Sequence, residues 1–187
     1  CKAVPDEQDI AVLSNQELSF DRATWKVGQY DLNAIEAGKQ LAKETEGSMT
    51  VLSAGNEKLK NTKLRKDILS RGADDLSVII REDQGFTDSL EVAKTLVEGL
   101  EAMDGFDLVL CGTGSSDLYN QQVGNQLGVL LNLPVVNGIS KITPQEGKLL
   151  VERVLENEVE VLELRLPAVV SVNSDINIPT IPGMKDI

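Results

Sequence analysis

Two clusters of small residues follow apolar runs that we expect to be strands, and a ligand could bind there. Ser53-Ala54-Gly55 ends one run, and Gly112-Thr113-Gly114-Ser115-Ser116-Asp117 follows another. Small side chains let the backbone approach a ligand, and N–H groups near a helix N-terminus, with two hydroxyls, suit a phosphate. The second cluster is not G-x-G-x-x-G, because Asp117 replaces the third glycine, nor a Walker A loop. On pattern alone, nucleotide binding and an ordinary strand–turn–helix connection remain equally open.

Polar side chains near these clusters have simpler interpretations. We expect Gln121 and Gln122 in the first turns of the following helix, where they could bond a base or ribose but are more simply solvated. Asp31 is interpreted as the N-cap of an earlier helix. The many Glu residues of 152–163 are interpreted as the wet face of a hairpin. Nothing resembles a complete catalytic apparatus, so we expect neither catalysis by this chain alone nor a metal site.

Composition excludes several classes of protein. The 187 residues include no histidine, which excludes His-based zinc sites and Ser-His-Asp or Cys-His catalysis. Cys1 and Cys111 form no C-x-x-C, and free cysteines favour a reducing compartment, the cytoplasm. The net charge of −12 disfavours nucleic acid as a partner. No apolar run approaches the ~20 residues of a membrane span.

Hydrophobic periodicity predicts alternating strands and helices. Strands are expected at 49–54, 77–80 and 107–111. A first helix is expected at 31–43, a second ends near Gly72, and a fourth follows the glycine-rich loop. The third helix is expected to begin at Asp88 as N-cap, with Glu91 as capping-box partner. The inward faces are predicted to carry Ile35, Gly38, Leu41 and Ala42 in the first helix, Leu64, Ile68 and Leu69 in the second, Leu90, Ala93, Val97 and Leu100 in the third, and Val123, Leu127, Leu130 and Leu131 in the fourth.

These elements predict a single α/β domain over 1–187 with a Rossmann-like parallel sheet. The sheet is expected to hold at least three strands and a fourth before residue 5, most of it preceding Cys1. Residues 149–156 and 159–166 alternate apolar and charged side chains, which predicts a C-terminal antiparallel β-hairpin. A buried strand is expected at 167–172, followed by an extended, exposed tail at 177–187.

Six segments, in order, resemble the β subunit of electron transfer flavoprotein. They are 2–6, 31–37, 71–74, 112–124, 166–170 and 177–185. Residues 6–10, 66–72 and 115–119 resemble the FixA-type branch more specifically, which includes bacterial subunits associated with carnitine metabolism. The resemblance implies a Rossmann-like fold related to adenine-nucleotide α-hydrolases.

The resemblance also implies a role without catalysis of its own. Such a subunit pairs with an α subunit (FixB-type) that carries most of the FAD site, and itself buries AMP or, in electron-bifurcating members, a second FAD. The pair carries electrons between acyl-CoA-dehydrogenase-like enzymes and a membrane quinone oxidoreductase (FixC-type). These properties imply a protein of the bacterial cytoplasm.

Individual positions follow from the same resemblance. The implied cofactor-binding residues are Gly28, Tyr30, Asp31, Ala54, Gly112, Thr113, Gly114, Ser115, Ser116, Asp117, Gln121, Gln122 and Val123. The implied partner-binding residues are Ile181, Pro182 and Met184, within a contact loop at 176–187. Leu118 replaces an acidic residue of the family and Val123 a frequent threonine, so the choice between AMP and FAD stays open.

Two other functions remain open. A module of the same fold could sense AMP or ATP as a self-sufficient homodimer without redox work. An enzyme of the adenine-nucleotide α-hydrolase type is disfavoured, because the chain has no histidine and no glycine-serine pyrophosphatase signature.

Overall fold

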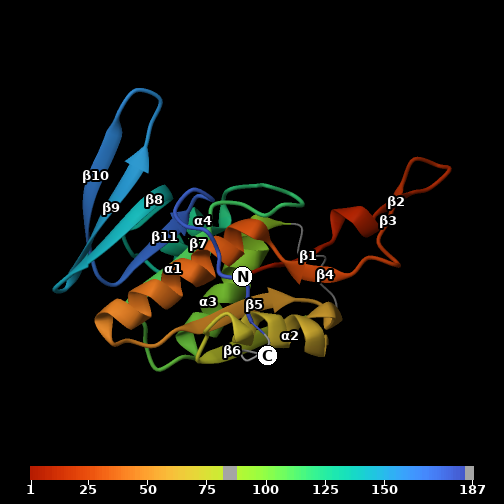
Figure 1. Cartoon of the computed structure of the whole chain (residues 1–187), viewed down its shortest axis with the longest axis horizontal. Coiled ribbons are helices and arrows are strands. Elements are labelled where there is room, and N and C mark those ends of the chain that lie inside the picture. The colour runs from red at the N-terminus through yellow and green to blue at the C-terminus, as the bar shows by residue number, and fades with distance from the viewer. Residues whose placement is uncertain (82–87, 184–187) are drawn as a thin grey trace.

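The computed structural model describes residues 1–81 and 88–183 and is elongated, with a projecting hairpin at either end (Figure 1). Strand β5 (Thr50–Gly55) pairs in parallel with β6 (Asp75–Ile80). A second sheet has the order β10-β9-β8-β11-β7, in which β11 (Ala168–Val172) is parallel to both β7 (Leu108–Gly112) and β8 (Val135–Gln145). The predicted α/β class with parallel strands is confirmed.

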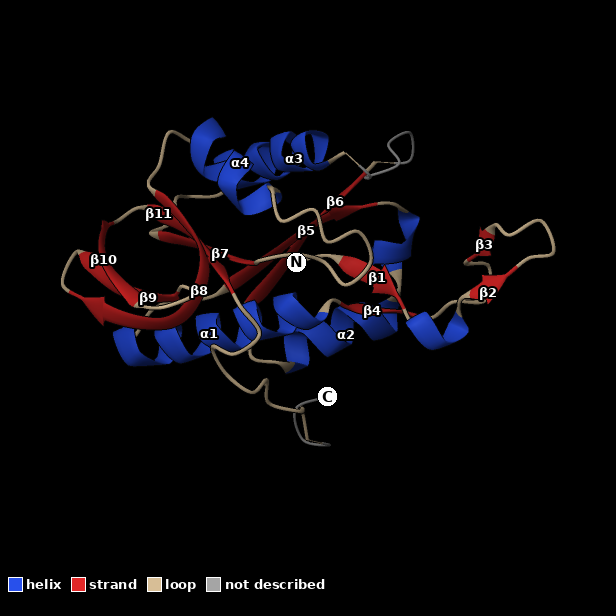
Figure 2. Cartoon of the chain, turned by 90° about the horizontal axis from the view of Figure 1, so that it is seen from above, coloured by secondary structure: helices blue, strands red, loops and turns tan. Residues whose placement is uncertain are grey.

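Helices cover both faces of these strands. Helices α1 (Gln29–Thr45) and α2 (Thr62–Ser70) lie on one face, and α3 (Ser89–Glu101) and α4 (Val123–Leu130) on the other, as Figure 2 shows. Short 3-10 turns are η1 (Glu7–Asp9) and η2 (Glu57–Lys60). Strands covered on both faces are mostly apolar, and all five residues of β11, Ser171 among them, are buried.

The predicted ends of α2 and α3 are confirmed. Helix α2 ends just before Gly72, whose φ of +97° is a backbone conformation that glycine adopts easily. The Asp88 carboxylate accepts hydrogen bonds from Leu90 N–H at 2.8 Å and Glu91 N–H at 3.1 Å, so Asp88 is the N-cap of α3. The Glu91 side chain pairs with Lys94.

Three leucines predicted to face inward are exposed instead. Leu69, Leu90 and Leu130 are 42%, 40% and 42% exposed. Leu69 and Leu130 adjoin the inward-facing Ile68 and Leu131, and one helical residue turns the side chain by about 100°. Leu90 lies in the first turn of α3, ahead of the buried Ala93.

The predicted C-terminal hairpin is confirmed as β9 (Lys148–Val154) and β10 (Val159–Arg165). Strand β8, which was not predicted, joins this hairpin to the parallel strands because its first half pairs with β11 and its second half with β9. Its register shifts near Gly138, whose φ is +71°.

The N-terminal prediction of a fourth parallel strand before residue 5 is wrong for residues 3–5. Strand β1 (Ala3–Pro5) pairs antiparallel with β4 (Trp25–Val27), whereas Cys1 donates a hydrogen bond to Leu52 of β5. Between β1 and β4, β2 (Ala11–Val12) and β3 (Leu18–Ser19) form an arm that projects from the body (Figure 1). Nor do the predicted strands form one sheet, since within the described ranges no ladder joins β5 to β7.

Of the predicted tail, the structure describes residues 177–183, which form no helix or strand, as expected, but are only partly exposed. Asn33 of α1 donates from Nδ2 to the carbonyl of Asn177 at 2.9 Å, and Asn177 donates back to the Asn33 carbonyl at 3.0 Å. Glu36 accepts from Thr180 N–H at 3.1 Å. Burial would raise the pKa of Glu36, but the hydrogen bonds from Thr180 and Gln40 hold it below its usual value.

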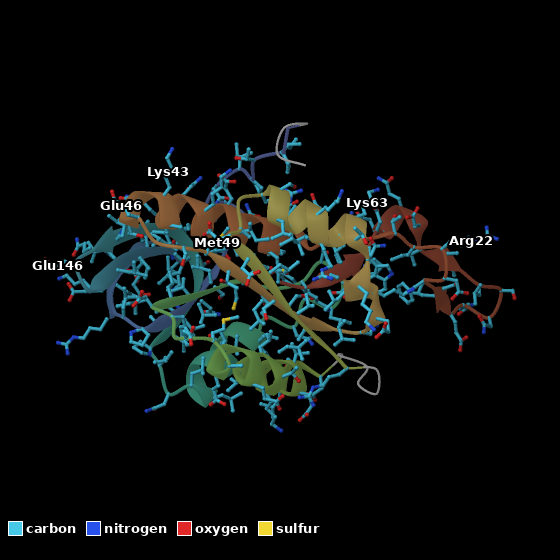
Figure 3. All side chains as sticks on the ribbon, turned by 90° about the horizontal axis from the view of Figure 1, so that it is seen from below. Arg22, Lys43, Glu46, Met49, Lys63 and Glu146 are labelled. Atoms are coloured by element: carbon cyan, nitrogen blue, oxygen red, sulfur yellow. The ribbon has the colours of Figure 1, made fainter. Side chains whose placement is uncertain are left out.

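Charged side chains cover the outer surface. Lys43 and Lys63 project from the layer of α1 and α2, whereas Met49 lies inside, next to α1 (Figure 3). No helix among the described residues is long and apolar enough to span a bilayer.

Candidate functional site

The carboxyl end of β7 lies directly against the first turn of α1. A Cβ placed on Gly112 would be 2.6 Å from Tyr30 Cβ and 2.8 Å from the Tyr30 carbonyl carbon. Only glycine fits so close to another backbone. This contact brings the predicted site residues at the start of α1 together with those that follow β7.

Two helices begin without a side-chain cap, α1 against the end of β7 and α4 after the loop that follows β7. Gly28 is the N-cap of α1 and Gln122 that of α4, and neither gives a side-chain cap hydrogen bond. The first N–H groups of a helix have no partner within the helix, and its dipole favours negative charge. Both ends can therefore accept an anionic group.

Asp31 is not the N-cap that the sequence indicated. It lies inside the first turn of α1, where Oδ2 accepts from Lys2 N–H at 2.7 Å and Oδ1 from Gly112 N–H at 3.4 Å. The carboxylate therefore joins the start of the chain to the end of β7, which is a structural role.

The loop after β7 is closed by an ion pair that sequence reasoning missed. Lys2 Nζ lies 2.7 Å from the Asp117 carboxylate and 3.4 Å from Ser115 Oγ. Burial would raise the pKa of Asp117, but hydrogen bonds from Lys2 and Ser115 lower it on balance. The two residues are 115 positions apart, so no local sequence pattern could predict that they form a pair.

The three hydroxyl side chains of the loop differ in burial and in hydrogen bonding. Thr113 is buried, and its Oγ1 donates to the Val172 carbonyl at 2.8 Å, which ties the loop to β11. Ser115 is partly buried beside Lys2, and Ser116 is exposed. Ser116 is thus the more accessible of the two predicted serines.

Both tyrosines of the chain lie at this site. Tyr30 and Tyr119 have ring centroids 5.5 Å apart and hydroxyl oxygens 3.2 Å apart. The hydrogen bond with Tyr119 and partial burial raise the pKa of Tyr30. The Tyr119 ring also covers Gly114, where a Cβ would lie 2.5 Å from the ring. Tyr119 was missed as a site residue, although the scarcity of aromatic residues was an available signal.

Gln121 and Gln122 precede α4 rather than lying in its first turns. Gln121 has a φ of +57°, and both side chains are exposed. Gln122 Oε1 accepts from Ser89 Oγ at 3.1 Å, at the start of α3. The conformation of Gln121 breaks the helix before α4, which begins at the partly buried Val123.

The other small-residue cluster is occupied by the protein itself. A Cβ on Gly55 would lie 2.9 Å from Leu59 Cδ1, so the turn η2 packs its leucine over the end of β5. Ala54 is partly buried there, and the neighbouring Ser53 donates to the Cys1 carbonyl at 2.7 Å.

Of the three predicted partner-binding residues, the structure describes Ile181 and Pro182. Ile181 is 87% exposed, Ile178 is 92% exposed, and Pro182 is partly buried. Met184 lies outside the described residues. The backbone on either side of Ile178 is held to α1 through Asn177 and Thr180.

The site can bind an anion but offers no thiolate. Burial raises the pKa of the Cys111 thiol to about 11, so this cysteine is protonated at neutral pH. Helix N–H groups without a side-chain cap are suited to phosphate, and aromatic rings can stack on a base. A family model described as the electron transfer flavoprotein domain matches residues 18–186.

Proposed function

Because the chain belongs to the electron transfer flavoprotein family, we propose that it is the β subunit of a FixA-type heterodimer. In this role it binds an adenine nucleotide, AMP or FAD, at the carboxyl end of β7. The subunit serves electron transfer without catalysing a reaction by itself.

One observation carries the proposal. The carboxyl end of β7 packs at Gly112 against the first turn of α1, which has no side-chain cap, and the loop that follows β7 leads to α4, whose N-terminus has none either. Backbone N–H groups at helix N-termini are well suited to phosphate oxygens. The carboxyl ends of parallel strands are also where open α/β sheets bind ligands.

The chain's own residues would hold and orient the nucleotide. The first N–H groups of α1 and α4 would bind phosphate, and Ser116 would donate from the exposed side of the loop. The Tyr119 ring, which packs on Gly114, would turn away to open the backbone there. A bound FAD would supply the redox chemistry, whereas a bound AMP would stabilise the folded loop.

The partners follow from the same proposal. An α subunit (FixB-type) would hold the redox FAD, and the exposed Ile178 and Ile181 would contact a partner dehydrogenase of the acyl-CoA type. A quinone oxidoreductase (FixC-type) would accept the electrons, in carnitine or related acyl-CoA metabolism. The net charge of −12 would speed association with basic surfaces, an effect that salt weakens.

The test is to co-express the chain with its α subunit, denature the purified complex and identify the released nucleotides by chromatography. Two FAD per heterodimer would assign a flavin to this chain, and one FAD with one AMP would assign a structural nucleotide. Reversible ATP binding by a homodimer without any α subunit would contradict the proposal and favour a sensing module.

Two variants test whether the nucleotide binds at the loop after β7. Gly114→Val puts a branched side chain into the loop and is expected to abolish nucleotide retention. Gly55→Ala changes the other strand end, where Leu59 already fills the space, and should retain the nucleotide. Equal retention by both variants would exclude the loop after β7 as the site.

A further inference from the structure

One segment of this acidic chain is strongly basic. Residues 57–71, which include the turn η2 and the helix α2, contain six basic and two acidic side chains, whereas the whole chain contains 18 and 30. The segment therefore has a net charge of +4 in a protein with a net charge of −12. Charge of one sign that is collected on one part of a surface attracts groups of the opposite sign.

The basic side chains of α2 lie on its solvent side. Leu64 and Ile68 are 3% and 2% exposed, so they form the face that packs on the body. Successive helical residues are about 100° apart, which directs Lys63, Arg65 and Lys66 away from that buried face. All three of these side chains are exposed, and we call them the basic face of α2.

The carboxylates of the segment do not neutralise the basic face. Glu57 is paired with Lys60 at 2.6 Å, and Asp67 is paired with Arg71 at 3.0 Å. Among the described residues, no ion pair includes any of the three cations of the basic face. These cations can therefore pair with the carboxylates of another molecule without first leaving a partner in this chain.

Exposed apolar side chains adjoin the basic face. Arg71, which follows α2, donates from Nη1 to the Thr180 carbonyl at 3.2 Å and so joins the tail to the helix. Ile178 and Ile181, on either side of Thr180, extend into solvent, and Leu69 of α2 is exposed as well. The tail lies on the outer side of the layer that α1 and α2 form (Figure 2).

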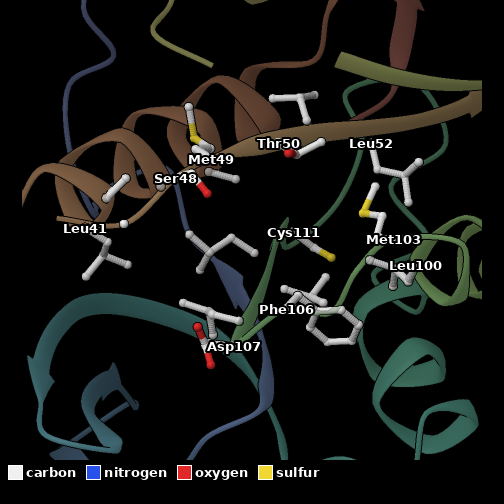
Figure 4. A pocket seen from close by; sticks show the side chains of 18 of the residues that line it. Leu41, Ser48, Met49, Thr50, Leu52, Leu100, Met103, Phe106, Asp107 and Cys111 are labelled. Carbon is white, nitrogen blue, oxygen red and sulfur yellow. The ribbon is translucent and has the colours of Figure 1, made fainter. Parts of the chain in front are cut away.

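The inner side of this layer has a different character. Leu41 of α1 and Met49, just before β5, lie there among the side chains that line the apolar interior (Figure 4). Lys63 projects from the outer side, on which the tail also lies (Figure 3). The layer thus buries its own apolar side chains and presents cations and isoleucines together to solvent.

A protein fits this outer side better than an extended polyanion does. Nucleic acids and anionic membranes carry negative charge over areas much larger than this segment, and the acidic remainder of the chain would repel them. A second copy has the same net charge of −12, which opposes self-association. A partner protein can instead confine its carboxylates to the area of contact.

We propose that the basic face of α2 docks a protein whose own surface carries carboxylates beside an apolar pocket. The carboxylates would pair with Lys63, Arg65 and Lys66, and the pocket would accept Ile181. Because the two signs of charge lie on different parts of this chain, the field of the partner would turn the basic face toward it before contact. This inference goes beyond the proposed function, since it requires neither a nucleotide nor electron transfer.

The test measures the binding of a defined acidic peptide to the full chain. The probe is a fluorescent peptide of about 20 residues with Leu on one helical face and Glu on the other. Fluorescence anisotropy gives its affinity at about 0.1 M salt, where charges farther apart than ~10 Å are largely screened. The triple variant Lys63→Glu, Arg65→Glu and Lys66→Glu should bind at least about tenfold more weakly, because each change replaces an attraction by a repulsion.

The control makes the same change of charge elsewhere. Arg22, Lys94 and Arg165 are exposed and lie outside α1, α2 and the tail. The triple variant Arg22→Glu, Lys94→Glu and Arg165→Glu should weaken binding less than about threefold, since these charges are distant and screened. Equal losses in the two triple variants would overturn the proposal, because net charge alone would then explain the binding.

Two further measurements locate the contact. Ile181→Ala should weaken binding about threefold or more without changing its salt dependence, since it removes an apolar contact only. A carbodiimide joins lysine amines directly to carboxylates, and it should couple the peptide to Lys63 and Lys66 in preference to Lys94. Affinity unchanged by Ile181→Ala, or coupling spread evenly over the lysines, would contradict the proposed contact.

Other occupants would give different results. Tighter binding of the parent chain to a DNA duplex or to phosphatidylserine vesicles than to the peptide would overturn the assignment to a protein. Self-association of the parent chain that is lost in the basic-face variant would identify a second copy as the occupant and overturn it too. Protection of Lys63 and Lys66 from acetylation in a purified complex with an α subunit would also overturn the proposal, because the face would already be covered.

Discussion

Strands β5 and β7 both end in small residues, but a side chain covers the end of β5 and a helix N-terminus lies against the end of β7. At β5 the protein fills the space with Leu59, and the side chains of Asn56 and Asn61 cap the turn η2 and the helix α2. At β7, Gly112 packs directly against the backbone of α1, and neither α1 nor α4, which follows the loop after β7, has a side-chain cap at its N-terminus.

The two strand ends illustrate how a packing site and a binding site can be distinguished. Small residues at a strand end only make room, and a buried leucine uses that room for stability. Uncapped helix N-termini leave donors without a partner in the helix, and an anion can satisfy them. Stability and binding should therefore separate between the two ends.

The largest effect is expected at the β5 end. Leu59 is 3% exposed, so Leu59→Ala should lower the free energy of unfolding by about 3 kcal/mol through lost burial and a cavity. Chemical denaturation measures this loss. Tyr119→Phe at the β7 end, where the ring is 47% exposed, should change stability by less than about 0.5 kcal/mol. A larger loss of stability for Tyr119→Phe than for Leu59→Ala would contradict the assignment of packing to the β5 end.

The second effect compares two glycines. Gly112→Ala places a Cβ 2.8 Å from backbone of α1, which cannot move alone, and should cost about 2–3 kcal/mol. At Gly55 the obstacle is the end of the Leu59 side chain, and the loss should stay below about 1 kcal/mol, since alanine also restricts the unfolded chain. Urea titrations of both variants measure the contrast, which equal losses would remove.

Helix capping gives the third effect. Asn61 Oδ1 accepts from Lys63 N–H at 2.9 Å and Leu64 N–H at 3.3 Å, so Asn61→Ala should cost about 1 kcal/mol. Gln122→Ala removes no cap and should stay within about 0.5 kcal/mol. Thermal unfolding of both variants tests this, and a similar loss at Gln122 would mean that α4 depends on its side chain.

The smallest effect is electrostatic. The lowered pKa of Asp117 means that its pair with Lys2 stabilises the fold above the unfolded-state pKa of about 3.9. This stabilisation, below about 1 kcal/mol, is lost as the pH falls through the folded-state pKa. Asp117→Asn should therefore differ from the parent at pH ~7 and converge with it in acid. Glu57→Gln, whose pair with Lys60 is exposed, is the control at the β5 end.

Local sequence signals predicted those parts of the fold that depend on local physics. The Asp88 cap, the stop at Gly72 and the hairpin of β9 and β10 follow from short-range hydrogen bonding, backbone freedom and alternation. Strand β8 escaped prediction because Pro134, Gly138 and Pro144 are typical of loops, and its two halves have different partners.

The candidate site was predicted less completely, since long-range contacts build it. The pattern after β7 identified the loop itself, but Lys2 reaches Asp117 across 115 residues, and nothing near either residue indicates the other. Asp31 is a typical cap residue, yet its carboxylate is used by Lys2 and Gly112. Only the folded chain could show that the uncapped end of α1 lies at the end of β7.

The attachment of the tail to α1 has a consequence for molecular recognition. Hydrogen bonds from Asn33 and to Glu36 hold the backbone at Asn177 and Thr180, while Ile178 and Ile181 extend into solvent. Ordering a free backbone costs about 1–2 kcal/mol per residue, and folding has already met this cost here. A protein that binds these isoleucines would meet a preorganised surface and lose less conformational entropy than it would on a free tail.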